Sequence, residues 1–361
     1  MHIKALYLHN FRLYEEARFD FSPTINVVRG ANARGKTSLL EAVYFLITGR
    51  SFRTTQTKDL IRHGAPYFYL EAIFVKHSIE QKLRVYYSPA ERRVTYNSTS
   101  CPSLGSLLGI LQGAVIHPDD AALVKGAPAV RRHLLDIQLA QSDPLYMHHL
   151  TRYDRAMRQR NHLLRAKNNA TIDSWEYEMA NAASYIVQQR SLAVNALHVL
   201  GQERYHTICG GSEPMHLSYK ANGAGGHPLE DAAVLRDIYR DQYRRHRDRE
   251  IDLGATLTGP HKDDILIAIG DNEAKAFGSE GQQRSCVVAL RLAEWARLRD
   301  CSVINAASQE LPLMLIDDLG MSLDTRRRKH LLAHFENLEQ VFISTTEEST
   351  LIEGEHSILM E

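Results

Sequence analysis

The feature that most constrains the fold is the run Gly30–Thr37, which reads G-x-x-x-x-G-K-T. The segment before it, Ile25–Val28, is rich in β-branched residues, as buried strands are. After it, apolar residues recur at helical spacing, at Leu39, Leu40, Val43, Leu46 and Ile47. The sequence therefore predicts a strand, a loop and a helix with one buried face, and Gly49 is the expected helix stop.

A loop of this pattern, placed between a strand and a helix, is typical of nucleotide-binding proteins. Its glycines let backbone amides turn inward around phosphate oxygens, and the helix N-terminus adds partial positive charge. Lys36 is expected to reach the β and γ phosphates of ATP, and the Thr37 hydroxyl to hold Mg²⁺. The predicted nucleotide-binding residues are Gly30, Ala31, Asn32, Ala33, Arg34, Gly35, Lys36, Thr37 and Ser38.

A phosphate loop needs an acidic partner for its metal, supplied at the end of a second buried strand. The run Leu313–Ile316 followed by Asp317 and Asp318 fits this description. Asp317 is predicted to coordinate magnesium, and Asp318 to orient or deprotonate the attacking water as the catalytic carboxylate. Taken alone, this run would more often be a strand that ends in an acidic turn. Because the chain also contains a phosphate loop, we favour the metal site over the acidic turn.

Composition narrows the class of protein. The chain has 361 residues with 43 basic and 43 acidic side chains, so a polyanion would have to be held by local patches. The cysteines are far apart and form no C-x-x-C pair, which argues against a disulfide framework and indicates a reducing cytosol. No apolar run approaches the ~18 residues of a membrane helix. A cytoplasmic protein with no membrane association is expected.

The character of the chain changes twice. Residues 1–126 indicate strands with one embedded helix, including a meander over 70–75, 81–87 and 93–97. Residues 127–252 are predicted to be helical, with loops at 210–211 and 222–226. Residues 253–361 return to alternating elements: strands over 265–269, 313–316 and 341–344, and helices over 287–298 and 326–338. The two outer parts are candidates for one parallel sheet that a helical insertion interrupts.

Two short runs are ambiguous in isolation. Ser279–Arg284 has an S-x-G-Q pattern that could be merely a capped helix entrance, and Ser322–Asp324 could be merely a turn. The order along the chain changes their meaning. Phosphate loop, S-x-G-Q, acidic strand and S-x-L-D follow one another as they do in ATPases of the ABC and SMC class.

At this point the chain resembles the bacterial RecF family of SMC-like ATPases of recombinational DNA repair. The likeness runs almost end to end and is carried by motifs at residues 8–12, 49–53, 118–120, 126–128, 131–132, 159–161 and 258–264. It implies an α/β fold, an ABC-type P-loop ATPase head with an inserted helical second lobe. In that scheme 1–126 and 253–361 together build the head, and 127–252 is the second lobe.

The resemblance implies that two heads sandwich ATP between them. Ser279, Gly281 and Gln282 of one subunit would then face the nucleotide held by the other. Ser322 and Asp324 match the family's D-loop, and Thr345 or Thr346 its switch position, of which Thr346 is preferred. The resemblance further implies sequence-independent binding of single-stranded and duplex DNA, slow DNA-stimulated ATP hydrolysis, and cooperation with RecO and RecR in recombinase loading.

The chain departs from the family pattern at two places. Glu280 stands where relatives commonly have glutamine, and we expect its side chain to point away from the nucleotide because a carboxylate would oppose phosphate binding. The segment 319–321 also lacks the bulkier residues usual there.

A basic cluster provides the direct indication of DNA binding. Residues 151–170 hold six basic side chains and one acidic one, a local charge of +5. A helix that carries them could neutralise several phosphates, although a solvated helix face explains the same pattern. A second cluster, Arg244–Arg249, is diluted by neighbouring carboxylates.

Two other functions compete with an ATP-gated DNA-binding switch. A phosphate-loop metabolic kinase would need a pocket for a small acceptor and would leave the S-x-G-Q run without a role. A structural SMC protein that bridges distant DNA segments would need a long coiled-coil arm. The residues between the two halves are too few to build one and still fold back.

Overall fold

The computed structural model describes residues 1–211, 213–305, 310–318, 338–346 and 354–360. The chain divides into two compact units. Unit 1 comprises residues 1–121, 204–212 and 280–361, and unit 2 comprises residues 122–203 and 213–279.

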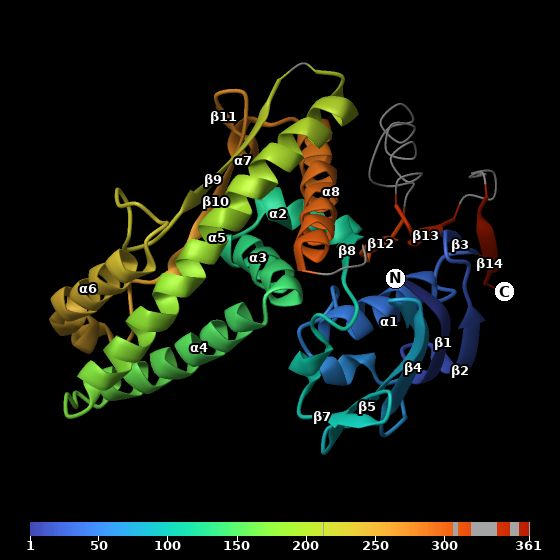
Figure 1. The fold of residues 1–361 in the computed structure, drawn as a ribbon, viewed down its shortest axis with the longest axis horizontal. Coiled ribbons are helices and arrows are strands. Elements are labelled where there is room, and N and C mark those ends of the chain that lie inside the picture. Colours follow the sequence, from blue (N-terminus) through green and yellow to red (C-terminus); the bar gives the residue numbers. More distant parts are fainter. Residues whose placement is uncertain (212, 306–309, 319–337, 347–353, 361) are drawn as a thin grey trace. The chain divides into compact units, whose positions relative to one another are not determined.

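Unit 1 contains a sheet that joins the two ends of the sequence. Its strands are β3 (Ile25–Arg29), β8 (Gly113–Ile116), β12 (Leu313–Ile316), β13 (Val341–Thr345) and β14 (His356–Leu359). They lie in the order β14-β3-β13-β12-β8, and every neighbouring pair is parallel. In Figure 1 the blue strand β3 lies between the red strands β13 and β14. The prediction of one parallel sheet built from both outer parts is confirmed.

The second sheet of unit 1 is antiparallel. It contains β1 (His2–Phe11), β2 (Tyr14–Asp20), β4 (Phe68–Lys76), β5 (Ile79–Tyr87), β6 (Arg92–Tyr96) and β7 (Thr99–Cys101) in the order β2-β1-β4-β5-β6-β7. Alternate residues such as Leu6, Leu70 and Val85 are fully or almost fully buried, so one face belongs to the core. The predicted meander is confirmed.

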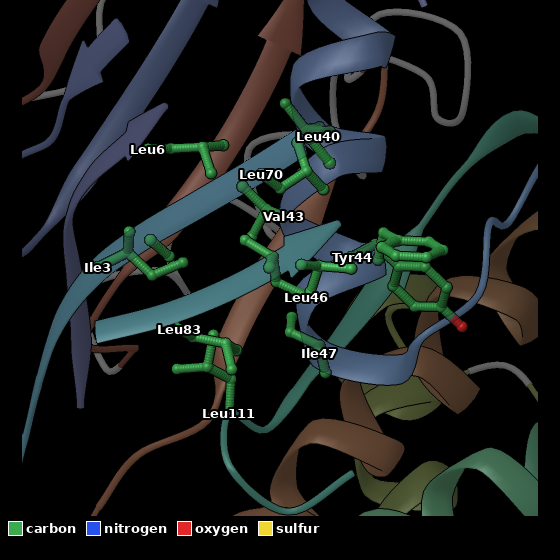
Figure 2. Packing of buried hydrophobic residues seen from close by; sticks show 14 of the residues in the cluster. Ile3, Leu6, Leu40, Val43, Tyr44, Leu46, Ile47, Leu70, Leu83 and Leu111 are labelled. Carbon is green, nitrogen blue, oxygen red and sulfur yellow. The ribbon is translucent and has the colours of Figure 1, made fainter. Parts of the chain in front are cut away.

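Helix α1 (Lys36–Thr48) lies between the two sheets and contacts strands of both. Figure 2 shows Val43 and Leu46 of this helix packed with Leu6, Leu70 and Leu83 from the antiparallel sheet. Every residue of α1 except Thr37 is buried. The prediction of one buried face was therefore wrong, because a helix covered by sheets on opposite sides buries its whole circumference.

Gly49 ends α1 as predicted. It adopts the left-handed conformation at φ 69°, and its amide donates to the Phe45 carbonyl at 2.7 Å. A left-handed residue after the last turn closes the helix, and glycine does so without steric cost.

Unit 2 is built from long helices and a small sheet. Its elements are α2 (Ala122–Lys125), α3 (Pro128–Ser142), α4 (Pro144–Arg165), most of α5 (Ile172–Cys209), α6 (Ala232–Leu253), α7 (Ala274–Phe277), β9 (Met215–Lys220), β10 (Asp264–Ile269) and β11 (Asn272–Glu273). Within the described part of the chain, no helix has the length and apolar character needed to cross a bilayer.

The division into units places residues 122–126 in unit 2 and residues 204–212 in unit 1, and it differs most from the predicted domain limits at residues 253–279. These residues belong to unit 2 because β10 pairs antiparallel with β9 along its whole length, in the sheet order β11-β10-β9. The sequence reading missed β9, which lies between the two glycine-rich loops at 210–211 and 222–226.

One arginine of the predicted basic cluster is a core residue of unit 2. Arg160 has no solvent exposure, and its guanidinium lies 3.0 Å from Glu176 and 2.6 Å from Glu250. Breaking a buried ion pair by removing one partner costs about 3–5 kcal/mol, so loss of the Arg160 side chain would destabilise the fold. It cannot contact DNA from this position.

His261 in the same unit is held as a neutral imidazole. The Tyr153 hydroxyl lies 2.7 Å from Nδ1, and Nε2 lies 3.1 Å from the Thr256 carbonyl, which suits a ring that accepts at Nδ1 and donates from Nε2. Burial lowers the pKa of His261 to about 4 from its ordinary 6.5. The folded state therefore resists a proton that the unfolded state accepts.

We predict that His261 makes stability fall between about pH 6.5 and pH 4, with a slope of up to about 1.4 kcal/mol per pH unit from this one group. The contribution is fully present above pH 6.5, the ordinary value, and is lost as the pH falls toward 4. His261→Gln should flatten this slope in urea unfolding measured from pH 4.5 to 7.5. His148→Gln, at an exposed position, is the control and should keep the wild-type slope.

Candidate functional site

The phosphate-loop segment folds as a tight turn between β3 and α1. Gly30 and Gly35 have φ values of 151° and 97°, which side chains rarely tolerate. The Tyr14 hydroxyl donates to the Gly35 carbonyl at 3.0 Å, and the Met360 amide donates to the Arg29 carbonyl at 2.8 Å. Tyr14 and Met360, from opposite ends of the chain, therefore hold the two ends of the loop through hydrogen bonds.

Lys36 is the first residue of α1, and its side chain folds back along the loop. Its ammonium donates to the carbonyl oxygens of Gly30 at 2.7 Å and Ala31 at 2.8 Å. Burial lowers the pKa of Lys36, and the nearby carboxylates of Asp318 and Asp317 oppose that shift. The Lys36 ammonium thus lies against the loop carbonyls, and the carboxylates of Asp317 and Asp318 are near it.

Asp317 connects the phosphate loop to the acidic strand. Its Oδ1 accepts from the Thr37 hydroxyl at 2.9 Å and from the Ser344 hydroxyl at 2.7 Å. The Asp318 amide donates to the same Ser344 oxygen at 2.8 Å, and Asp318 has a left-handed φ of 56°. Since β3, β13 and β12 are parallel, their carboxyl ends meet at one edge of the sheet.

This cluster suits a magnesium ion. Mg²⁺ prefers hard oxygen ligands such as carboxylates, hydroxyls and phosphate oxygens. The Thr37 hydroxyl and the Asp317 carboxylate supply two such groups in direct contact with each other. The residues present therefore fit the predicted metal, which Thr37 and Asp317 would hold.

Part of the phosphate loop lines a pocket of about 510 Å³, whereas Gly30, Ala31, Arg34 and Asp317 are not among its lining residues. Its lining from the predicted set comprises Asn32, Ala33, Gly35, Lys36, Thr37, Ser38, Asp318 and Thr346. A second wall, which sequence reasoning did not assign, comprises Arg12, Leu13, Arg53, Asp59, Ile61 and His63. Ser344 and Thr345, at the end of β13, complete it. The pocket lining therefore includes the arginines Arg12 and Arg53 in addition to Lys36.

A fully buried glutamate holds the two arginines of that wall. The Arg12 guanidinium donates to Glu41 of α1 from Nε at 2.8 Å and from Nη2 at 2.6 Å, and Nη1 of Arg53 lies 3.7 Å from the same carboxylate. The signal was available in the sequence, because Arg12 and Arg53 lie in two of the segments that carry the family resemblance. Their position on a pocket wall depends on Glu41, which no motif marks.

The S-x-G-Q segment lies at the start of α8 (Glu280–Asn305), and Ser279 and Glu280 are exposed. The Glu280 carboxylate lies 2.7 Å from the Arg284 guanidinium one turn later. Gly281 and Gln282 are described in unit 1, and neither is among the residues that line the pocket. Ser322, Asp324 and the predicted helix over 326–338 lie outside the described residues.

A buried ion pair ties α8 to the pocket's second wall. Arg291 of α8 binds Asp120, which also contacts the His117 ring at 3.0 Å, and Phe52 stacks on that ring at 5.0 Å between centroids. Burial alone would raise the pKa of Asp120, but Arg291 and His117 bring it down to about 2. Phe52, the neighbour of Arg53 in the chain, therefore packs on a histidine that contacts the buried Asp120–Arg291 ion pair.

Comparison with known proteins agrees with this architecture. The family model described as "RecF/RecN/SMC N terminal domain" matches residues 2–360. An SMC head bound to the C-winged helix domain of ScpA has the same fold, with a TM-score of 0.54 at 16% identity, covering 97% of this chain and 90% of that chain. Fold and site thus define an SMC-type head of the ABC ATPase class.

Closer relatives carry one name. "DNA replication and repair protein RecF" of Protochlamydia amoebophila is 46% identical over 347 residues, 96% of this chain and 94% of the relative. That of Chlamydia caviae is 35% identical and covers 96% of this chain and 92% of the relative. A solved structure described as "recombination mediator protein RecF-ATPrS in RecFOR pathway" matches with a TM-score of 0.89 at 25% identity, over 99% and 96% of the two chains. The chain belongs to the RecF family.

We predict that Gly35→Ala weakens ATP binding at least ~10-fold. An added Cβ would lie 2.7 Å from the Tyr14 hydroxyl, and an L-residue held at this left-handed φ costs about 1–2 kcal/mol. Calorimetric titration with ATP measures the change. Ala33→Gly is the matched control: Ala33 already has a φ of 63°, so glycine relieves strain there and affinity should stay within ~3-fold of wild type.

Proposed function

We propose that this chain is an ATP-dependent DNA-binding protein of DNA replication and recombinational repair. ATP would draw two heads together on DNA, and slow hydrolysis would release them. The observation that carries the proposal is that Lys36, Thr37 and Asp318 line one pocket in a RecF-family head, where the Thr37 hydroxyl donates to Asp317. Relatives named as DNA replication and repair proteins support the DNA-linked role.

The chain's own groups supply the binding and catalytic steps. The Lys36 ammonium would exchange its contacts with the Gly30 and Ala31 carbonyls for phosphate oxygens, beside the amides of the loop and the N-terminus of α1. Mg²⁺ would neutralise charge that develops on the phosphates, with Thr37 and Asp317 as its protein ligands. Asp318, whose amide donates to the Ser344 hydroxyl, would orient or deprotonate the attacking water.

A composite site between two copies explains the accessible S-x-G-Q segment. Ser279 and Glu280 are exposed, so a second copy can reach this turn, and the Arg284 contact gives the Glu280 carboxylate a partner other than phosphate. Ser279, Gly281 and Gln282 would contact the partner's nucleotide. Ser322 and Asp324 would act as the D-loop and Thr346, on the pocket wall, as the switch residue.

The proposal includes DNA-stimulated, slow ATP turnover in the cytoplasm and cooperation with RecO and RecR. Its support is the family membership and a similar protein described as a recombination mediator in the RecFOR pathway. The metabolic-kinase alternative has no comparable support, since the relatives reported above are named DNA replication and repair proteins.

We predict three distinct responses to ATP. Lys36→Ala should lose ATP binding and stay monomeric, because it removes the ammonium that compensates the phosphates. Asp318→Asn should bind ATP and accumulate as a dimer, with hydrolysis at least ~100-fold slower. Light scattering after gel filtration, with and without ATP, measures the dimer, and phosphate release measures turnover.

Ser279→Arg is the matched control, since its side chain is exposed and lies outside the pocket lining. It should bind ATP with wild-type affinity and yet remain monomeric. An Asp318→Asn protein that stays monomeric when saturated with ATP, or a Ser279→Arg protein that dimerises like wild type, would contradict the composite site.

A further inference from the structure

The structure separates the basic side chains of unit 2 into two groups. Arg160 is buried between carboxylates, and the exposed Arg152 guanidinium binds Glu178. On α6, Arg245 pairs with Asp241 at 2.5 Å and Arg247 pairs with Glu176 at 2.5 Å. These cations are already compensated within the unit. Because their carboxylate partners neutralise them, these arginines contribute little positive charge to the binding of an external anion.

A second group remains without compensation on one side of α4. Arg155, Arg158, His162 and Arg165 are exposed and follow one another at spacings of three, four and three residues. At 100° and 1.5 Å per residue these positions fall within about 80° of arc and span about 15 Å. Within the described residues, no carboxylate lies at ion-pair distance from these three arginines. We refer to these four residues as the α4 stripe.

The composition of α4 differs from that of the neighbouring helix. Both helices have 22 residues, but α6 balances six arginines with five carboxylates, whereas α4 has five arginines and only Asp154 as a carboxylate. A solvated helix face normally mixes both signs, as α6 does. An uncompensated row of cations in a chain with no net charge marks a local site for a polyanion.

We propose that the α4 stripe is a contact surface for the phosphate backbone of duplex DNA. This inference rests on the proposed DNA-binding function and assigns it to particular residues. A row about 15 Å long extends over several base pairs of a duplex, which rise 3.4 Å each along the helix axis, so more than one phosphate lies within its reach. Guanidinium groups donate in pairs to phosphate oxygens, and an imidazole N–H can donate once. Such contacts bind DNA irrespective of sequence.

The test is the salt dependence of DNA binding by the full-length protein with ATP and Mg²⁺. The probe is a 30-base-pair duplex of random sequence, labelled with a fluorophore and measured by anisotropy at several salt concentrations. Each lost phosphate contact lowers the slope of log K against log salt by about 0.9, so Arg155→Gln with Arg158→Gln should lower it by about 2. The dissociation constant near 0.1 M salt should rise ~10-fold or more.

The matched control carries Arg236→Gln with Arg245→Gln on α6, which removes the same charge from residues already paired with Asp237 and Asp241. Its slope should equal that of wild type. The ATP affinity of both double variants should equal that of wild type, since no substituted residue lines the nucleotide pocket. Their thermal midpoints should also equal that of wild type, because none of the four substituted side chains is buried.

The possible failures can be told apart. If wild type binds the duplex and both double variants keep its slope, or both lower it equally, the α4 stripe is not the contact surface, and the proposed function stands. If wild type itself fails to bind the duplex in ATP, the proposed function falls, and the assignment of the stripe falls with it.

Discussion

The site depends on one carboxylate oxygen. Oδ1 of Asp317 accepts hydrogen bonds from Thr37, on the phosphate-loop helix, and from Ser344, on the strand between the loop and the acidic strand. These contacts require that β3, β13 and β12 end at the same level, which the parallel register provides. A slip of one residue in β13 would turn Ser344 to the other face and separate the three strands' polar ends.

Around this centre, two buried carboxylates are paired with arginines. The buried Glu41 pairs with Arg12, and the buried Asp120 pairs with Arg291 of α8. Ion pairs to buried carboxylates therefore hold both the second pocket wall and α8 within unit 1. Unit 2 uses the same device at Arg160. Such pairs are strongly destabilising when broken, so they fix geometry more than they add to stability. Several segments that mark the family have this structural role.

Much of this architecture could be predicted from local pattern. The strand, loop and helix at residues 25–48 and the strand before Asp317 are confirmed, because each is encoded by spacing over a few residues. The shared parallel sheet is confirmed as well, and it was predicted from the alternation of strands and helices at both ends of the chain. Three features could not be predicted from the sequence. Strand β9 is exposed on alternate positions and pairs only with a distant segment, the burial of α1 depends on two sheets, and Glu41 gains its role only when Arg12 and Arg53 approach it. Each requires contacts between residues far apart in sequence.

The position of β3 between β13 and β14 has a consequence for biosynthesis. Both neighbours of this strand come from the far end of the sequence, so during translation its amide and carbonyl groups have no partners in the parallel sheet until the last strands leave the ribosome. An unpaired strand edge invites association with other chains, and pairing over such separation is slow. The nascent chain therefore passes through a period in which it cannot yet respond to nucleotide and depends on its antiparallel sheet for early order.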